Sequence, residues 1–223
     1  SARESKLITS WMNPNADYEA ALDAFVAALL ERRDSNLFLR DLQSTVPLFA
    51  WYGALNSLTL AGLKCLSPGV PDFYQGHASI ELSLMDPDNR RPVDHERRRE
   101  LLQRAEASLG LAQRAADWRE LLSRAADGEA KFRLTWAALQ LRRNHAVMLR
   151  DAEYLPLALS GERAAHGVAF ARRGAGGWIV VVATRLYASL GLAVGQAPIG
   201  AVWGDTILRL PDDAEGLHWT DAL

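Results

Sequence analysis

The spacing of apolar residues changes near residue 153, and this change constrains the fold more than any other feature of the chain. Before it, apolar residues recur every three or four positions, as at Phe132, Trp136 and Leu139, which places them on one face of a helix. After it, apolar residues alternate with polar ones or form short runs bounded by glycine, which is typical of strands. The sequence therefore predicts an α+β protein whose helices precede an antiparallel sheet.

The first part of the chain predicts a series of helices, over residues 16–33, 35–65, 94–110, 114–126 and 128–147. Asn15 is a suitable N-cap for the first helix, because its side-chain oxygen can accept a first-turn N–H. Pro47 lies inside the second helix and has no backbone N–H, so we expect a kink or two consecutive helices there.

Four strands are expected in the last part, over residues 154–159, 167–172, 178–184 and 206–210. Gly174–Gly177 favours a hairpin turn rather than a phosphate-binding loop, because strands flank it on both sides. One further strand is expected at Val70–Tyr74, between Gly69 and Gly76. A lone strand cannot satisfy its own backbone groups, so we expect its neighbours in a segment outside this chain.

The charge pattern gives no reason to expect a nucleic-acid partner. The whole chain has 25 Lys and Arg against 27 Asp and Glu. Residues 90–150 are basic, with 14 Lys and Arg against 8 Asp and Glu, but the two signs alternate at helical spacing. This pattern favours solvated helix faces with local ion pairs.

Other residue counts limit the chemistry that the chain could carry. Because Cys65 is the single cysteine, the chain cannot form an intrachain disulfide. Cys65 lies at the end of an apolar helix, so we expect it to be a packing residue rather than a nucleophile. The five histidines lack metal-ligand spacing, so we expect no metal site. No apolar run approaches the roughly 18–20 residues that span a bilayer. A reducing, cytoplasmic location without a membrane partner is therefore expected.

The polar segment Asp86–Asp94 is the strongest candidate for a binding site. It combines carboxylates, an amide and guanidinium groups, on Asp86, Asp88, Asn89, Arg90, Arg91 and Asp94. Such groups can accept from and donate to sugar hydroxyls, and Tyr74 and other nearby aromatic residues (Phe73, Trp11, Trp51 and Tyr52) could stack on a sugar ring. The alternative interpretation is a loop in which these charges only brace one another.

Longer motifs resemble a known family. Pro68–Gly76 resembles the eighth barrel strand of the α-amylase clan, which carries a G-x-P-x-x-Y-x-G pattern. Together with Leu82–Asp94, Arg3–Lys6, Thr9–Trp11 and Trp203–Thr206, it is similar to the maltooligosyltrehalose synthases of that clan. The segment His77–Glu81 departs from the family pattern, because Ala78 stands where the family has an acid and Ile80 where it has tryptophan.

The resemblance implies the end of a (β/α)8 barrel in residues 1–93, with strand eight and its loop. Residues 94–150 would be a helical segment that completes or bridges the barrel, and 151–223 an antiparallel β-sandwich domain. The three catalytic carboxylates of the clan lie on strands four, five and seven, so they would precede Ser1, and no catalytic residue is assigned here. Asp86, Asp88, Asn89, Arg90, Arg91 and Tyr74 are the expected substrate-binding residues.

The implied activity of the parent enzyme is a retaining, intramolecular transglycosylation without a cofactor. It converts the reducing-end α-1,4 bond of a maltooligosaccharide to the α,α-1,1 bond of trehalose. The expected partners are the maltooligosaccharide and the rest of the barrel, and the isolated chain is expected to be inactive. A stand-alone carbohydrate-binding or docking module, or another enzyme of the clan, are the alternatives.

The β region is expected to be structural, with Trp203 or Trp219 burying surface against the barrel. A starch-binding surface built from the same two tryptophans is the alternative.

Overall fold

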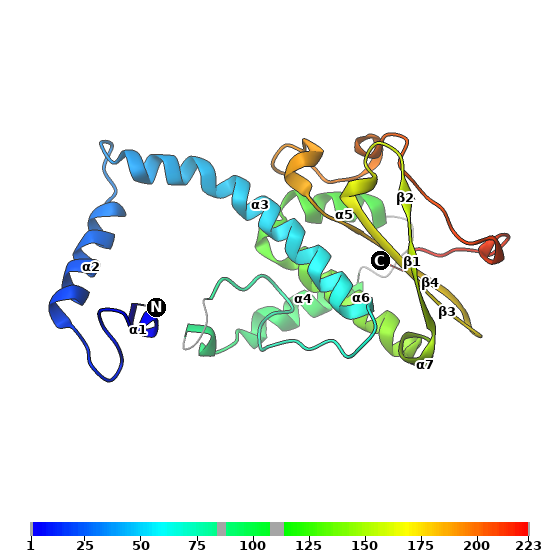
Figure 1. Cartoon of the computed structure of the whole chain (residues 1–223), viewed down its shortest axis with the longest axis horizontal. Helices are drawn as coiled ribbons and strands as arrows, with labels where there is room; N and C mark the ends of the chain where they lie inside the picture. The colour runs from blue at the N-terminus through cyan, green and yellow to red at the C-terminus, as the bar shows by residue number, and fades with distance from the viewer. Residues whose placement is uncertain (1, 84–87, 108–113, 223) are drawn as a thin grey trace. The chain divides into compact units, whose positions relative to one another are not determined.

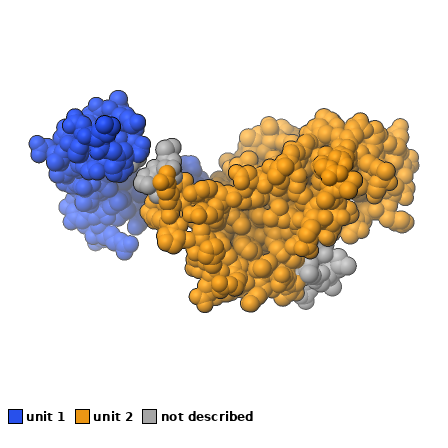
Figure 2. Space-filling view, turned by 90° about the horizontal axis from the view of Figure 1, so that it is seen from below, with its two compact units in different colours: residues 1–49 blue, residues 50–223 orange. Residues whose placement is uncertain are grey.

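The computed structural model describes residues 2–83, 88–107 and 114–222 of the chain. The chain divides into two compact units, residues 1–49 and 50–223 (Figure 2). The division falls inside one helix, and the domain boundaries expected after residues 93 and 150 stay predictions.

The first unit is a small helical unit held by polar contacts. It contains α1 (Ala2–Ser5), α2 (Ala16–Leu29) and the beginning of α3 (Leu37–Leu66) (Figure 1). Asn15 is the N-cap of α2, as predicted, and its side-chain oxygen accepts from the Tyr18 N–H at 3.0 Å. The Arg3 guanidinium donates to Glu19 through Nε at 2.8 Å and Nη2 at 2.6 Å. No residue of α2 is buried.

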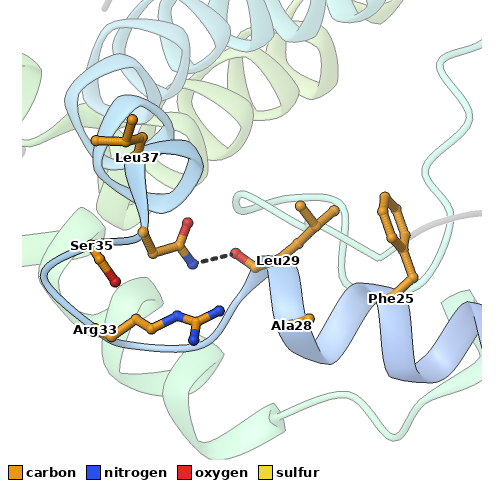
Figure 3. Close-up of a pocket in the computed structure, with 7 residues that line it drawn as sticks. Phe25, Ala28, Leu29, Arg33, Ser35 and Leu37 are labelled. Carbon is orange, nitrogen blue, oxygen red and sulfur yellow. Dashed lines mark hydrogen bonds between the residues drawn. The ribbon is translucent and has the colours of Figure 1, made fainter.

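Helix α3 runs without a break through Pro47. Of the two alternatives that the proline raised, two consecutive helices is therefore wrong. Asn36 begins the helix by accepting from the Leu39 N–H at 3.0 Å, and its amide donates to the Leu29 carbonyl at 2.9 Å (Figure 3). By length and composition alone α3 could cross a membrane, with a mean hydropathy of 1.2 over an 18-residue stretch of which 22% is buried. The expectation that no segment meets this test is wrong.

The second unit combines the end of α3 with four further helices and two sheets. The helices are α4 (His95–Ala107), α5 (Arg114–Ser123), α6 (Glu129–Asn144) and α7 (Ala146–Asp151). Short 3-10 turns lie at Asp88–Arg90 (η1), Ala125–Asp127 (η3), Ala164–His166 (η4), Tyr187–Leu190 (η5), Gly200–Trp203 (η6) and Asp212–Ala214 (η7).

The two sheets are small and antiparallel, as the last part of the sequence predicted. One has the order β1 (Glu153–Leu157), β3 (Gly167–Gly174), β4 (Gly177–Thr184), and the other pairs β2 (Leu159–Ser160) with β5 (Ile207–Leu208). Gly174 pairs with Gly177 across the tight turn between β3 and β4, which confirms the predicted hairpin. The chain is therefore a mixed helix and sheet protein.

The strand predicted at residues 70–74 is wrong for this structure. These residues form no strand, and among the described residues no strand of either sheet pairs with them. The prediction rested on residue type, but a strand also needs hydrogen-bonded neighbours, and those are set by contacts distant in sequence.

Two apolar clusters form the core of the second unit. One joins Trp51, Leu55 and Leu58 of α3 to the Leu121–Ala130 region and to Tyr187 and Leu190. The other joins the end of α3 to α6, α7 and the three-stranded sheet through Cys65, Ala138, Leu149, Phe170 and Val181.

The end of α3 is also held by hydrogen bonds. Arg142 of α6 donates to the Cys65 carbonyl at 2.8 Å and to the Gly69 carbonyl. A guanidinium at a helix C-terminus satisfies carbonyl groups that have no partner within the helix.

Candidate functional site

The candidate site begins with a tight turn that follows the irregular segment 70–74. The His77 N–H donates to the Tyr74 carbonyl at 3.1 Å, and Gly76 has φ +85°, a left-handed conformation that favours glycine. The Tyr74 ring is 45% exposed and meets the His77 imidazole edge to face, with centroids 5.5 Å apart. Tyr74 therefore presents a partly open aromatic surface, as the binding interpretation requires.

The second part of the site is the 3-10 turn at Asp88–Arg90 and the residue after it. Asp88 forms an ion pair with Arg91, while the side chains of Arg90 and Arg91 are exposed. The Asn89 side chain is half-buried, and its oxygen accepts no hydrogen bond from the described residues. Asp86 lies outside the described residues.

The third acid of the segment serves the helix that follows. The Asp94 side chain accepts from the Arg97 N–H at 2.9 Å, as an N-cap of α4 does. Together with the Asp88–Arg91 pair, this contact fits the bracing interpretation of the loop. Asn89, Arg90 and Tyr74 are the residues whose surroundings also suit a ligand.

Two side chains connect the turn to the loop, and sequence reasoning missed both. The Gln75 amide donates to the Arg91 carbonyl at 3.5 Å. Arg98 of α4 donates to the Gly76 carbonyl at 2.8 Å and to the Asp94 carbonyl at 2.9 Å. The spacing of neighbouring residues does not predict these contacts, because Arg98 and Gly76 lie 22 positions apart in the sequence. Tyr74 and the 88–94 segment are thus brought together by hydrogen bonds to backbone carbonyls.

Charged groups surround the start of the turn. Lys64 donates to the Asp72 carbonyl at 3.0 Å, and its ammonium lies 4.7 Å from the centroid of the Phe73 ring. Burial lowers the pKa of Lys131, and the nearby positive charge of Lys64 lowers it further. Hydrogen bonds from Ser83, with its backbone N–H as the larger cause, lower the pKa of Glu81. The site is therefore polar on both sides of the turn.

The other aromatic residues that could have stacked on a sugar have different roles. Trp51 is buried in the core, and the Tyr52 hydroxyl donates to the Leu192 carbonyl at 2.9 Å. Trp11 lies in the first unit, where the Arg3 guanidinium carbon is 5.0 Å from the centroid of the Trp11 ring. Trp51 and Tyr52 therefore belong to the core of the second unit, and burial leaves no face of Trp51 open to a sugar.

Cys65 is a packing residue in this structure. It is fully buried, and burial raises the pKa of its thiol. A thiol in this setting has little thiolate, which agrees with the prediction of packing over nucleophilic catalysis.

Cavities also lie away from this site. One of about 330 Å³ lies beside the connection between α2 and α3 and is lined by Phe25, Leu29, Arg33 and Leu37 among others (Figure 3). It holds one charged side chain and no converging pair of acid and base, so it does not compete with the site around Tyr74.

The curated proteins that the chain resembles share one name. No protein-family model matches the chain. Over 221 residues it is 33% identical to proteins named putative maltooligosyl trehalose synthase from two strains of Mycobacterium tuberculosis. The match covers 99% of this chain and 24% of each relative, so the chain spans about a quarter of their length.

Solved structures give the same picture. A maltooligosyltrehalose synthase from Arthrobacter ramosus is 32% identical with a TM-score of 0.72, over 94% of this chain and 24% of that one. A hypothetical maltooligosyl trehalose synthase from Sulfolobus tokodaii is 26% identical with a TM-score of 0.58, over 82% of this chain and 22% of that one. The part matched is the C-terminal one.

Proposed function

This chain is homologous to the C-terminal part of maltooligosyltrehalose synthases, and from that relationship we propose that it works as that part of such an enzyme. The whole enzyme would convert the reducing-end α-1,4 bond of a maltooligosaccharide to an α,α-1,1 bond by retaining, intramolecular transglycosylation. The three carboxylates that carry out this chemistry would lie outside the chain, which by itself would be inactive.

The observation that carries this proposal is the extent of the match. Sequence identity of 33% runs over 221 residues, and the fold agrees with a TM-score of 0.72 over 94% of the chain. A module that had kept only a sugar-binding loop would be expected to match over a shorter region. The near-complete match therefore favours a part of the enzyme over a stand-alone binding module.

The role that we propose for the chain is to supply one wall of the substrate pocket. Tyr74 would offer a ring face to the sugar, while Asn89, Arg90 and Arg91 would bind its hydroxyl groups. Asp86 and Asp88 belong to the same proposed set.

The partner that we propose is the rest of the catalytic barrel in the same protein. Large apolar side chains are exposed along α2 and the first half of α3, at Phe25, Val26, Leu30, Leu37, Phe38, Leu42, Val46, Leu48 and Phe49. An exposed apolar surface of this kind marks an interaction site. About three quarters of the relatives' length lies outside the matched region, which supplies a polypeptide to cover it.

A lipid bilayer is a poorer occupant for this surface. The second half of the same helix is packed in the core of residues 50–223, so α3 could not be surrounded by lipid over its length. We accordingly propose a cytoplasmic protein without a membrane partner.

The finer fold is part of the same proposal. Residues 1–93 would form the C-terminal part of the barrel, and residues 94–150 would be a helical segment that completes or bridges it. The two antiparallel sheets would belong to a β-sandwich with a structural role. Trp203 supports that role, because its indole N–H donates to the Pro198 carbonyl at 2.9 Å and its side chain is half-buried.

One experiment tests the proposal directly. The full-length product of the gene that encodes this chain is incubated with maltopentaose, and the loss of reducing ends is followed together with the formation of a trehalose-ended product. We expect conversion by the full-length protein and none by residues 1–223 alone. A gene product with only hydrolytic activity would refute the proposed reaction. Turnover by the isolated chain would instead refute the placement of the catalytic groups outside it.

A further inference from the structure

Arg98 joins the Tyr74 turn to the start of α4, the helix that directly follows the 88–94 segment. It lies in the first turns of α4, and the two arms of its guanidinium donate to different carbonyls: Nη2 to Gly76 at 2.8 Å and Nη1 to Asp94 at 2.9 Å. Gly76 belongs to the turn that carries Tyr74, whereas Asp94 closes the segment that carries Asn89, Arg90 and Arg91. A single side chain thus links the Tyr74 turn to the point where the 88–94 segment enters α4.

The turn is shaped to receive this guanidinium. A Cβ added at Gly76 would lie 2.9 Å from Nη2 of Arg98 and 3.5 Å from a carboxylate oxygen of Glu81. Glycine at this position therefore serves two purposes: it allows φ +85°, and it lets Arg98 approach the backbone.

The surrounding charges support the same arrangement. Glu81, whose pKa is lowered mainly by hydrogen bonds from Ser83, is close enough that the Arg98 guanidinium adds to that lowering. Gln75 adds a second link by donating to the Arg91 carbonyl at 3.5 Å. The neighbouring Arg97 pairs with Glu100 of its own helix at 3.2 Å, and within the described residues it forms no ion pair or side-chain hydrogen bond with the Tyr74 turn.

We propose that Arg98 is a positioning residue for the substrate site: it holds the Tyr74 turn and the 88–94 segment in one geometry without contacting the sugar. The expected effect on catalysis rests on the proposed function, whereas the link that Arg98 makes between the turn and α4 does not. The two hydrogen bonds are charge-assisted, and Arg suits the role because its planar fork can reach two acceptors in fixed directions.

The test compares Arg98→Ala with Arg97→Ala in the full-length protein. Both changes remove one positive charge from the same turn of α4, but only the first removes the link to Gly76. We expect Arg98→Ala to raise KM for maltopentaose about tenfold, with a smaller effect on kcat, because the groups it positions bind the substrate rather than react with it. Arg97→Ala should leave both parameters near those of the parent.

Hydrogen exchange supplies a readout that does not depend on activity. The His77 N–H should exchange faster in Arg98→Ala, since the turn that it closes loses its support, while Leu101 in the middle of α4 should exchange as in the parent. Arg98→Lys keeps the charge but presents one nitrogen in place of two, so it should retain only part of the protection at His77.

The possible outcomes separate the two proposals. Faster exchange at His77 in a protein without synthase activity would uphold the positioning role and refute the proposed function. Unchanged exchange and KM in Arg98→Ala would overturn the positioning role, and so would faster exchange throughout α4 with a normal KM, which indicates support of the helix alone. Full exchange protection of the His77 N–H in Arg98→Lys would also overturn the positioning role of the guanidinium, because a positive charge at this position would then be enough to support the turn.

Discussion

The two halves of α3 have similar apolar content but opposite surroundings. In the first unit Leu42 is 38% exposed and Phe49 is 70% exposed, whereas in the second unit Leu55 is 1% exposed and Cys65 is fully buried. The second unit covers its half of the helix with α5, α6 and the three-stranded sheet. The comparison teaches that hydrophobicity alone does not locate a core, because burial requires a covering element as well.

The first unit is organised instead by local polar contacts. Glu19 accepts from Arg3 and from the hydroxyl of the buried Thr9, and the Arg3 guanidinium lies over Trp11. These contacts define a local conformation without burying α2. The first unit is thus suited to completion by a partner, whereas the second unit has a core of its own.

The largest expected effect comes from deleting the same side chain in each half of α3. Leu55→Ala should lower the free energy of unfolding by about 2–5 kcal/mol, because it leaves a cavity among buried residues. Leu42→Ala removes an exposed side chain and should change the free energy of unfolding by less than about 0.5 kcal/mol. Urea unfolding followed by circular dichroism measures both. Equal effects would mean that the first half of α3 is buried in solution.

A smaller effect is expected at the end of α3. Arg142→Ala removes the hydrogen bond to the Cys65 carbonyl in the last turn of α3 and the one to the Gly69 carbonyl just after it, and should cost about 1.5–3 kcal/mol. Arg143→Ala, at the next and exposed position, is the matched control and should cost little. If the two variants unfold at the same urea concentration, then the cap contributes nothing to the second unit.

The polar network of the first unit predicts a pH dependence. Hydrogen bonds from Arg3, and then from Thr9, lower the pKa of Glu19 to about 2. The ordinary value is about 4.5, so the stabilisation should be complete above pH 5 and be lost as the pH falls toward 2. A carbon-detected titration of the Glu19 carboxyl measures its pKa, and Arg3→Gln should raise it. A pKa near the ordinary value in the parent chain would show that the network is absent in solution.

The smallest effect on stability is expected for the exposed face. Phe49→Ser should change the free energy of unfolding by less than about 0.5 kcal/mol but lower the binding of a dye that detects apolar surface. Leu60→Ser, an exposed position among polar neighbours in the second half of α3, should lower dye binding less. A larger loss at Leu60 would move the interaction surface to the second unit.

Local signals in the sequence were sufficient for most of the regular elements, although α1 and α7 were not predicted as separate helices. The period of apolar residues located α2 to α6, Asn15 located the first N-cap, and the glycines at 174–177 located the hairpin. Each of these depends on residues adjacent in sequence. Residues 70–74 could not be judged in this way, because a strand exists only with its neighbours.

The candidate site was predictable in composition but not in arrangement. An aspartate directly before a helix is a known N-cap signal, so the role of Asp94 could have been found from the sequence. The role of Arg98 could not, because its alternating charged neighbours are typical of a solvated helix face. The hydrogen bond that distinguishes Arg98 is made to the backbone carbonyl of Gly76, 22 residues earlier. Every residue has a backbone carbonyl, so the sequence does not mark this one as the acceptor.

Cys65 gives the chain an internal reporter of its own opening. It is the single cysteine of 223 residues, and it lies where α3, α6, α7 and the sheet meet. A thiol reagent can therefore modify the protein only when that junction separates, so the rate of modification measures how often it does. Because Cys65 is buried, a cysteine introduced at an exposed position would react well before it and could be labelled selectively.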